Sequence, residues 1–290
     1  MNNWKESELE HILHLWDDRP HTGMHHDKQI WNKRAGGWEN GLRTDKVRQK
    51  RSSRRVTSTA EYLIEKGALT PETELIDIGC GPGRFVAEFA KTAKHATGLD
   101  LSDSMTGFGA DFANENGLNN TSFINADFLT LDIDEAGLRG KYDLVFSSIT
   151  PAMAYKESVE KGIAMSKKWF YNSCFVSRTD SLLDPLGEKL GLPAAKRDTA
   201  VGFYCMFNQL FLKGLFPEVT YFHEDEDEEI TDLDSAAEEY FDKYFSCEKT
   251  AENLGKIKNT LESFADKDSI VRRRREIVYA WLLVDVTAAK

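Results

Sequence analysis

The sequence has few cysteines and no long apolar run. Its four cysteines, Cys80, Cys174, Cys205 and Cys247, are scattered and form no Cys-x-x-Cys pair, so we expect reduced thiols in a cytoplasmic protein. No stretch approaches the roughly 20 apolar residues that a helix needs to cross a bilayer. Residues 1–18 carry acids where a secretory signal carries basic residues, which argues against export.

The sequence also lacks an excess of basic residues. It has 37 Lys and Arg against 48 Asp and Glu, a net charge of −11, and this balance argues against a dedicated nucleic-acid binder. Two local basic runs, residues 46–55 and 272–275, leave open a contact with an anionic ligand or an RNA backbone. We favour solvated helix faces that pair with the acidic run at residues 223–234, since such charge runs usually face solvent.

Short apolar segments alternate with segments of helical periodicity in the middle of the chain. Five of them predict strands, at residues 74–79, 95–101, 121–127, 142–148 and 168–178. Strands that alternate with helices at this spacing predict an α/β fold, doubly wound, in which helices cover both faces of a mostly parallel sheet. Two late apolar segments, residues 218–224 and 276–286, bring the predicted sheet to seven strands.

The flanking regions are predicted to be mainly helical. Apolar spacing indicates a short helix over residues 5–16, another over about 44–66, and later helices over about 157–167, 200–216, 233–246 and 250–266. The stretch between the first two, residues 17–41, is rich in turn formers. We therefore expect an N-terminal helical lid (1–68), a core (69–230), a helical cap (231–268) and a segment that completes the sheet (269–290).

A glycine-rich loop follows the first predicted strand, in "LIDIGCGPGRF" at residues 75–85. Glycine gives up the most backbone freedom on folding, so three glycines in five residues suggest that a ligand approaches this backbone closely. In open parallel sheets a ligand lies at the carboxyl ends of the strands. The dinucleotide fingerprint G-x-G-x-x-G would need its third glycine where Arg84 stands. The pattern Asp-x-Gly-x-Gly-x-Gly is therefore a different loop.

This loop and the acids that follow it resemble class I S-adenosylmethionine-dependent methyltransferases over roughly residues 70–180. The resemblance implies that the glycine loop holds the methionine part of S-adenosyl-L-methionine, that Asp77 receives its amino group, and that S-adenosyl-L-homocysteine is the product. Asp100 matches the acid that accepts both ribose hydroxyls, and Asp127 with Phe128 matches the adenine site. The predicted cofactor-binding residues are Trp31, Arg34, Asp77, Gly79, Cys80, Gly81, Gly83, Asp100, Leu101, Met105, Asp127, Phe128 and Ser147.

The N-terminal segment "IWNKRAGGW" at residues 30–38 also resembles small-molecule members of this family, in which a helix closes over the cofactor. We interpret Trp31 and Trp38 as lid aromatics and Arg34 as a contact to an anionic group; the alternative is that the tryptophans simply cover the sheet. His21, His25 and His26 lie nearby, and we favour loop residues, one of them a candidate base, over metal ligands. We predict no metal.

The acceptor is not fixed by the sequence. "SSITPAMAY" at residues 147–155 lacks the Asn/Asp-Pro-Pro-Tyr/Phe motif typical of enzymes that methylate amino groups of bases or glutamine. Ser148, Thr150 and Tyr155 either line the acceptor side or pack. We therefore favour a small-molecule acceptor, with an RNA or protein acceptor and a non-catalytic binding module as the alternatives, and we assign no catalytic residue. Four apolar residues of the cap could serve a homodimer or a substrate pocket: Tyr240, Phe241, Tyr244 and Phe245.

Overall fold

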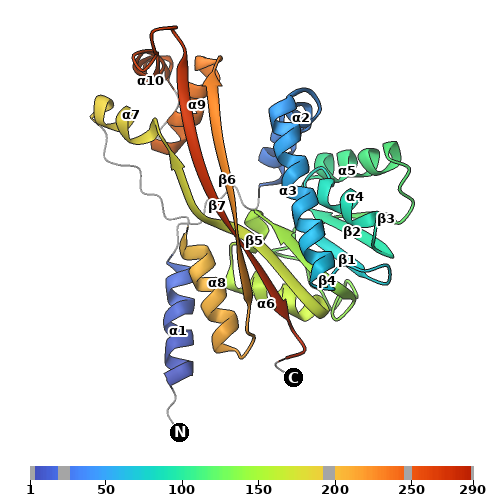
Figure 1. Ribbon diagram of the computed structural model, residues 1–290. Helices are drawn as coiled ribbons and strands as arrows, with labels where there is room; N and C mark the ends of the chain where they lie inside the picture. The colour runs from blue at the N-terminus through green and yellow to red at the C-terminus, as the bar shows by residue number, and fades with distance from the viewer. Residues whose placement is uncertain (1–3, 19–26, 192–199, 245–249, 289–290) are drawn as a thin grey trace. The chain divides into compact units, whose positions relative to one another are not determined.

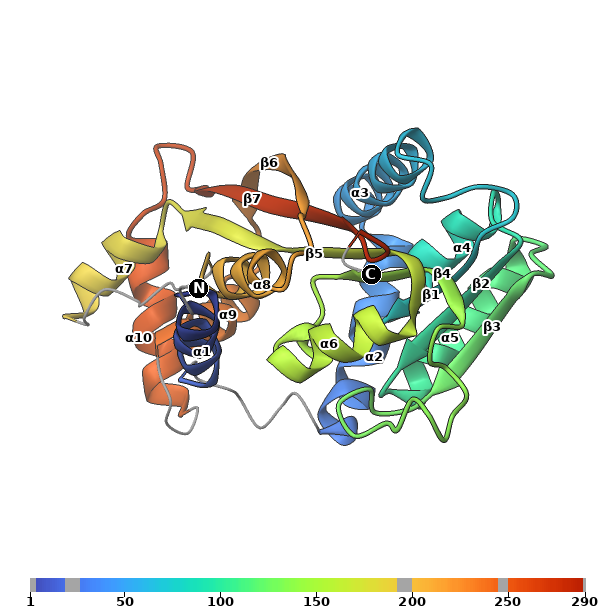
Figure 2. The ribbon, with the colours of Figure 1, turned by 90° about the horizontal axis from the view of Figure 1, so that it is seen from below.

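The apolar segments form a seven-stranded sheet in the computed structural model (Figure 1). The structure describes residues 4–18, 27–191, 200–244 and 250–288. The strands are β1 (Glu74–Ile78), β2 (His95–Asp100), β3 (Thr121–Asn125), β4 (Tyr142–Ser148), β5 (Ser166–Asp180), β6 (Glu218–Ile230) and β7 (Val271–Asp285). Their order is β3-β2-β1-β4-β5-β7-β6, and the first four lie side by side in both views (Figure 1 and Figure 2).

The sheet is mixed, because one strand runs against the others. The contacts of β1 with β2 and β4, of β2 with β3, and of β4 with β5 are all parallel. In β7 the direction reverses: Ser181 N–H donates to Arg274 O and Val286 N–H donates to Lys168 O, so residue numbers fall along one strand as they rise along the other. The predicted doubly wound, mostly parallel α/β fold is thereby confirmed.

The helices of the core and of the C-terminal half lie close to their predicted places. They are α4 (Arg84–Ala90), α5 (Asp103–Glu115), α6 (Lys156–Met165), α7 (Leu183–Leu190), α8 (Ala200–Leu212), α9 (Leu233–Tyr244) and α10 (Ala251–Glu262), with a 3-10 turn at Pro151–Met153. Of these, only α7 was not predicted. Its eight residues give too short a periodic signal to stand out from a loop.

The N-terminal region contains one helix more than the apolar spacing indicated, at the place where the resemblance implied a lid helix. It comprises α1 (Trp4–Asp17), α2 (Lys28–Thr44) and α3 (Lys46–Glu65). Most of α2 falls in the stretch that we interpreted as turn-rich. The side chain of Asp27 caps this helix by accepting from the backbone N–H groups of Gln29 and Ile30, which satisfies donors that a helix start leaves unpaired. Burial of Ala35 and Glu39 then offsets the cost of two adjacent glycines.

By its internal contacts the chain divides into two units. One contains residues 1–174, 202–220 and 281–290, and the other contains residues 175–201 and 221–280. The second unit has its own apolar core, which includes Leu186, Tyr240, Phe241, Ile257 and Leu261, all at most 1% exposed. We expected Tyr240 and Phe241 to be exposed and to serve a homodimer or a substrate pocket; this was wrong, because both are buried in the core that α7, α9 and α10 form. The side chains of Tyr244 and Phe245 lie outside the described residues.

The basic run at residues 272–275 lies on a strand, although we expected a helix. Arg272 pairs with Glu229 at 3.0 Å and Arg275 with Glu226 at 3.2 Å, so β7 sets its basic residues against the acids of β6. The predicted pairing of this run with the acidic run is confirmed. Its secondary structure was wrong, and so was the expectation that the whole run is solvated, because Arg273 is buried. Arg273, 4% exposed, is held by Glu228 at 2.7 Å.

Candidate cofactor-binding site

All three glycines of the predicted loop adopt left-handed backbone angles. Their φ values are +70° at Gly79, +51° at Gly81 and +69° at Gly83, a region that side chains disfavour. The loop is tied to the neighbouring strand, because the backbone N–H groups of Gly79 and Cys80 both donate to Leu99 O, over 2.7 and 3.1 Å. The turn after β1 is therefore fixed against β2.

Only one of these glycines faces open space. A Cβ atom at Gly79 would overlap the Thr150 side chain, and one at Gly83 would lie 2.9 Å from the Cα of Gly109. A Cβ at Gly81 would have no neighbour within 4 Å among the described residues. The protein's own packing thus accounts for Gly79 and Gly83. The prediction that a ligand approaches this backbone closely therefore stays a prediction for Gly81 alone.

Two acids from adjacent strands lie at this turn. Asp77 of β1 is 1% exposed, and within the described residues its Oδ2 atom has no hydrogen-bond partner. Burial, reinforced by the charge of Asp100, raises the pKa of Asp77 well above its ordinary value, although Arg55 opposes this shift. A buried carboxylate without a partner is costly. Asp77 is therefore suited to receive a positively charged donor.

Asp100, at the end of β2, is held in place by two backbone groups. Its Oδ2 accepts from Gly81 N–H and its Oδ1 from Ser102 N–H, each over 2.9 Å. Burial raises the pKa of Asp100 above its ordinary value, and these two hydrogen bonds oppose the rise. Because each carboxylate oxygen has two lone pairs, both oxygens can still accept from a ligand hydroxyl.

A lysine that the sequence did not single out organises the predicted adenine site. Lys161 of α6 donates to the carbonyl oxygens of Phe128 at 2.7 Å, Leu129 at 3.2 Å and Leu131 at 2.9 Å, and its ammonium lies 5.1 Å from the centre of the Phe128 ring. Asp127 starts this turn by accepting from Leu129 N–H. Such a turn of consecutive carbonyls around one cation has a defined shape before any ligand binds.

Helix α2 is attached to the loop after β2 by polar contacts. Ser102 Oγ donates to Asn32 Oδ1 over 2.5 Å, and Lys28 Nζ lies 3.0 Å from Asn125 Oδ1 and 3.4 Å from Asp103. The predicted lid residues Trp31 and Arg34 lie on this helix, with the Arg34 guanidinium carbon 5.6 Å from the Trp31 ring centre. These contacts place the predicted lid helix beside the end of β2.

Four other predicted site residues are buried or half-buried in the protein's own packing. Cys80 is 7% exposed, and burial raises the pKa of its thiol well above the ordinary value, so it stays protonated. Ser147 is fully buried; its hydroxyl donates to Tyr171 O and accepts from the Asn172 amide. Met105 is 4% exposed inside α5. Leu101 is half-buried after β2. A contact between any of them and a cofactor stays a prediction.

The segment after β4 lies against the glycine loop. Ile149 has a φ of +51°, which is rare for a β-branched residue and is often found at functional sites. Its N–H donates to Ser173 O over 2.8 Å. Thr150 then caps the 3-10 turn by accepting from Ala152 N–H, and its side chain fills the space beside Gly79. Of our candidate acceptor-side residues, Thr150 is thus in contact with the loop.

Neither a metal centre nor a membrane helix is found in the part of the chain that the structure describes. No cluster of three or more His, Cys, Asp or Glu there could hold a metal ion, and no helix there is long and apolar enough to cross a bilayer. His21, His25 and His26 lie outside the described residues. The residues present do fit S-adenosylmethionine, since a buried acid without a partner and a second anchored acid flank a turn that is open at Gly81.

Comparisons with known proteins agree with this arrangement. Residues 75–167 match the family described as "Methyltransferase domain". Phosphoethanolamine N-methyltransferase 1 from Zea mays is 27% identical over 143 residues, which cover 44% of this chain and 27% of that protein. An uncharacterized RNA methyltransferase from Chlorobaculum tepidum is 32% identical over 76 residues, which cover 26% of this chain and 16% of that protein. The chain thus spans about a quarter or less of the length of these relatives.

A solved structure shares the fold. The YcgJ protein from Bacillus subtilis superimposes with a TM-score of 0.52 at 16% identity, over 79% of this chain and 98% of that chain. The order of the strands, the glycine loop and the family match over residues 75–167 agree with one another. The chain contains, within residues 75–167, a methyltransferase domain of the class I, S-adenosylmethionine-dependent type.

Proposed function

We propose that this chain transfers a methyl group from S-adenosylmethionine to a small-molecule acceptor. The observation that carries the proposal is Asp77, a buried carboxylate whose Oδ2 atom has no partner among the described residues, beside the open backbone of Gly81. The amino group of the cofactor would supply the missing positive charge. The names of the relatives support the small-molecule acceptor, since several act on molecules such as phosphoethanolamine and sterols.

When bound, S-adenosylmethionine supplies a methyl group on a sulfonium that reacts by direct displacement. The chain's part is to bind and align. Asp77 would hold the amino group, Asp100 the ribose hydroxyls, and the turn at Asp127 and Phe128 the adenine, while Lys161 keeps that turn in shape. With the cofactor held at three places, an acceptor in the correct position needs little further reorganisation.

The acceptor would lie where the segment after β4 meets the loop. Ile149 and Thr150 are fixed there by the Ser173 carbonyl and the 3-10 turn, and α2 lies beside β2 through Asn32. We propose that α2 acts as a lid that excludes water, which strengthens electrostatic contacts in the site. The enclosure of the acceptor by the helical cap of residues 231–268 stays a prediction.

An RNA acceptor is the second candidate, favoured by exposed basic residues along α3. Lys46, Arg48, Lys50 and Arg54 are all exposed on this helix, and a surface of this kind can follow a phosphate backbone.

Binding and transfer should be measured separately. Calorimetry with S-adenosylhomocysteine tests the cofactor site, with Asp77→Ala expected to bind at least about tenfold more weakly. Transfer of a labelled methyl group is then measured to a small-molecule metabolite extract and to total RNA. Label in small molecules supports the proposal. Label in RNA, together with RNA binding that weakens steeply as the salt concentration rises, supports the second candidate. In the calorimetry, equal S-adenosylhomocysteine affinities of Asp77→Ala and the wild type overturn the proposed cofactor site.

A further inference from the structure

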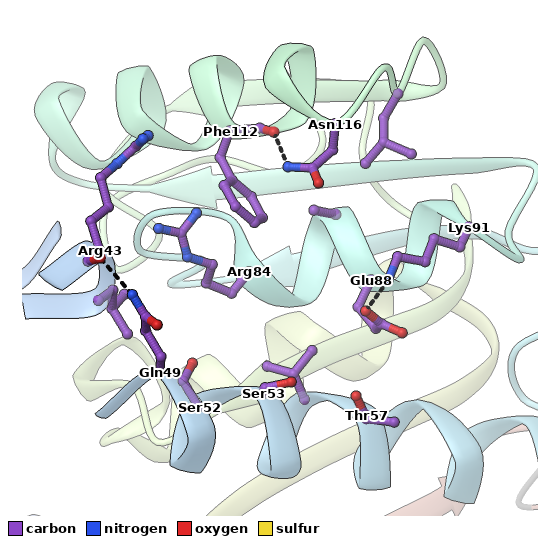
Figure 3. Close-up of a pocket in the computed structure, with 14 residues that line it drawn as sticks. Arg43, Gln49, Ser52, Ser53, Thr57, Arg84, Glu88, Lys91, Phe112 and Asn116 are labelled. Carbon is purple, nitrogen blue, oxygen red and sulfur yellow. Dashed lines mark hydrogen bonds and ion pairs between the residues drawn. The ribbon is translucent and has the colours of Figure 1, made fainter. Parts of the chain in front are cut away.

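A pocket beside the glycine loop shares no residue with the predicted cofactor set, although its lining residue Arg84 directly follows Gly83. Helices α2, α3, α4 and α5 surround this pocket of about 540 Å³ (Figure 3), a volume in the range of small-molecule sites. None of its lining residues belongs to the predicted cofactor set, and all lie in the first unit. The proposed methyl transfer gives this pocket no role.

One wall of the pocket carries three hydroxyl groups. Ser52, Ser53 and Thr57 lie on the same side of α3 and line the pocket together with Gln49 (Figure 3). No hydrogen bond is found for these three hydroxyls within the described residues. They are therefore available as donors to whatever enters. Val56 of the same helix adds an apolar contact.

The facing wall holds a guanidinium with an unused donor. Arg84 of α4 donates through Nη2 to both carboxylate oxygens of Glu39, each over 2.9 Å. Its guanidinium carbon lies 3.6 Å from the centre of the Phe112 ring, and Figure 3 shows this ring next to Arg84. Nη1 of Arg84 is buried and has no partner among the described residues. Because buried donors are nearly always hydrogen-bonded, we expect Nη1 to bind an acceptor on a ligand.

The carboxylates near Arg84 leave its Nη1 donor unused. Glu39 is shared between two guanidinium groups, since Arg43 also donates to it over 2.6 Å, and Arg43 pairs with Glu115 at 3.1 Å as well. Burial lowers the pKa of Arg84, although Glu39 opposes this, and an anionic acceptor for Nη1 would favour the charged guanidinium further. At the other end of the pocket Lys91 pairs with Glu88, and these two charges cancel.

We propose that this pocket binds a small phosphomonoester. Its phosphate oxygens would accept from Arg84 Nη1 and from the hydroxyls of Ser52, Ser53 and Thr57, and its organic part would pack on Phe112. A phosphomonoester suits this donor set because its three terminal oxygens can use both a guanidinium and hydroxyl groups, whereas a carboxylate offers only two. The pocket is larger than inorganic phosphate requires, so we expect the ligand to carry an organic group beside its phosphate.

Phenyl phosphate is a suitable probe, titrated into the full chain by calorimetry or by NMR. Benzoate tests the carboxylate alternative and phenol the apolar part alone. Saturable binding of phenyl phosphate, tighter than that of benzoate and absent for phenol, supports the proposal. Tighter binding of benzoate, or no binding of phenyl phosphate at millimolar concentration, overturns it.

Two charge-adding substitutions on α3 locate the binding site. Ser53→Glu puts a negative charge into the pocket, and Ser58→Glu adds the same charge to the same helix at a position that does not line it. We expect Ser53→Glu to weaken phenyl phosphate binding at least about tenfold and Ser58→Glu to leave it within about twofold. Equal effects of the two variants overturn the site. Unfolding temperatures of both variants verify that each is folded.

A competition experiment tests whether this pocket is distinct from the predicted cofactor site. S-adenosylhomocysteine binding is measured alone, and phenyl phosphate is then titrated in its presence. Retained phenyl phosphate binding supports a distinct pocket, whereas full competition overturns it. Because the cofactor analogue is measured independently, failure of the proposed methyltransferase function would be seen as a separate result.

Discussion

The backbone N–H of Gly81 donates to Oδ2 of Asp100 over 2.9 Å. This hydrogen bond joins the one open position of the glycine loop to the acid at the end of the next strand. The other oxygen of Asp100 accepts from Ser102 N–H, so the carboxylate is held from both sides. The loop and the predicted ribose-binding acid therefore form one fixed unit before any ligand arrives, an arrangement that lowers the entropy cost of binding.

Asp100→Asn is expected to weaken S-adenosylhomocysteine binding at least about tenfold, because the amide replaces one acceptor oxygen with a donor and removes the charge. Asp232→Asn is a matched control. Asp232 also accepts two backbone N–H groups, from Asp234 and Ser235, but it belongs to the second unit. Calorimetry should show a loss for the first variant only. Unchanged affinity in Asp100→Asn would remove this residue from the site.

Gly81→Val is expected to abolish S-adenosylhomocysteine binding while the chain still folds. The substitution forces a β-branched residue to a φ of +51°, at a cost of about 1–2 kcal/mol, and fills the open space. Gly140→Val is the control, since Gly140 has a φ of +57° and also faces open space, but lies in the loop before β4. Both variants should lose similar stability in urea unfolding, and only Gly81→Val should lose binding. Loss of binding in both would point to backbone strain instead.

The sheet and the loop could be predicted because their signals are local. Alternating strands and helices, and glycines at fixed spacing after β1, are readable over a few residues. Helix α2 could not be predicted in this way, since Gly36 and Gly37 argue against a helix. Besides the Asp27 cap, the helix is stabilised by distant residues: Arg84 binds Glu39, and Ser102 binds Asn32.

Local sequence patterns also failed to predict that the C-terminal basic run forms part of a strand. Four consecutive arginines give no apolar alternation, so residues 272–275 do not resemble a strand. Their partners are acids on β6, more than 40 residues earlier in the chain, and include Glu226 and Glu229. Ion pairs across neighbouring strands replace the apolar packing that a sequence pattern detects.

Glu39→Gln is expected to lower the free energy of unfolding by about 3 kcal/mol. Glu39 is 4% exposed and pairs with both Arg84 and Arg43, and removing one partner of a buried ion pair leaves uncompensated charge. Lys91→Ala removes an exposed partner of Glu88 and should cost less than about 1 kcal/mol. Urea unfolding measures both. A small effect at Glu39 would mean that solvent reaches this pair.

Asp77→Asn should change how stability depends on pH. Burial and the neighbouring charge of Asp100 raise the pKa of Asp77 well above its ordinary value. Above the ordinary pKa of an aspartate, about 3.9, the unfolded chain has therefore lost a proton that the folded chain retains. Stability then falls as the pH rises toward the raised pKa.

An asparagine has no proton to lose, so the advantage of Asp77→Asn over the wild type in the free energy of unfolding should grow from about pH 5 to about pH 8. S-adenosylhomocysteine binding should show the opposite trend. The cationic amino group of S-adenosylhomocysteine favours ionised Asp77, so the affinity of the wild type for this ligand should rise with pH over this range. The affinity of Asp77→Asn should stay lower and nearly constant. Urea unfolding and calorimetry at the two pH values measure both trends. If the stability difference between the two proteins were the same at both pH values, Asp77 would not titrate with a raised pKa, and the buried acid without a partner would lose its role as the receptor for a cation.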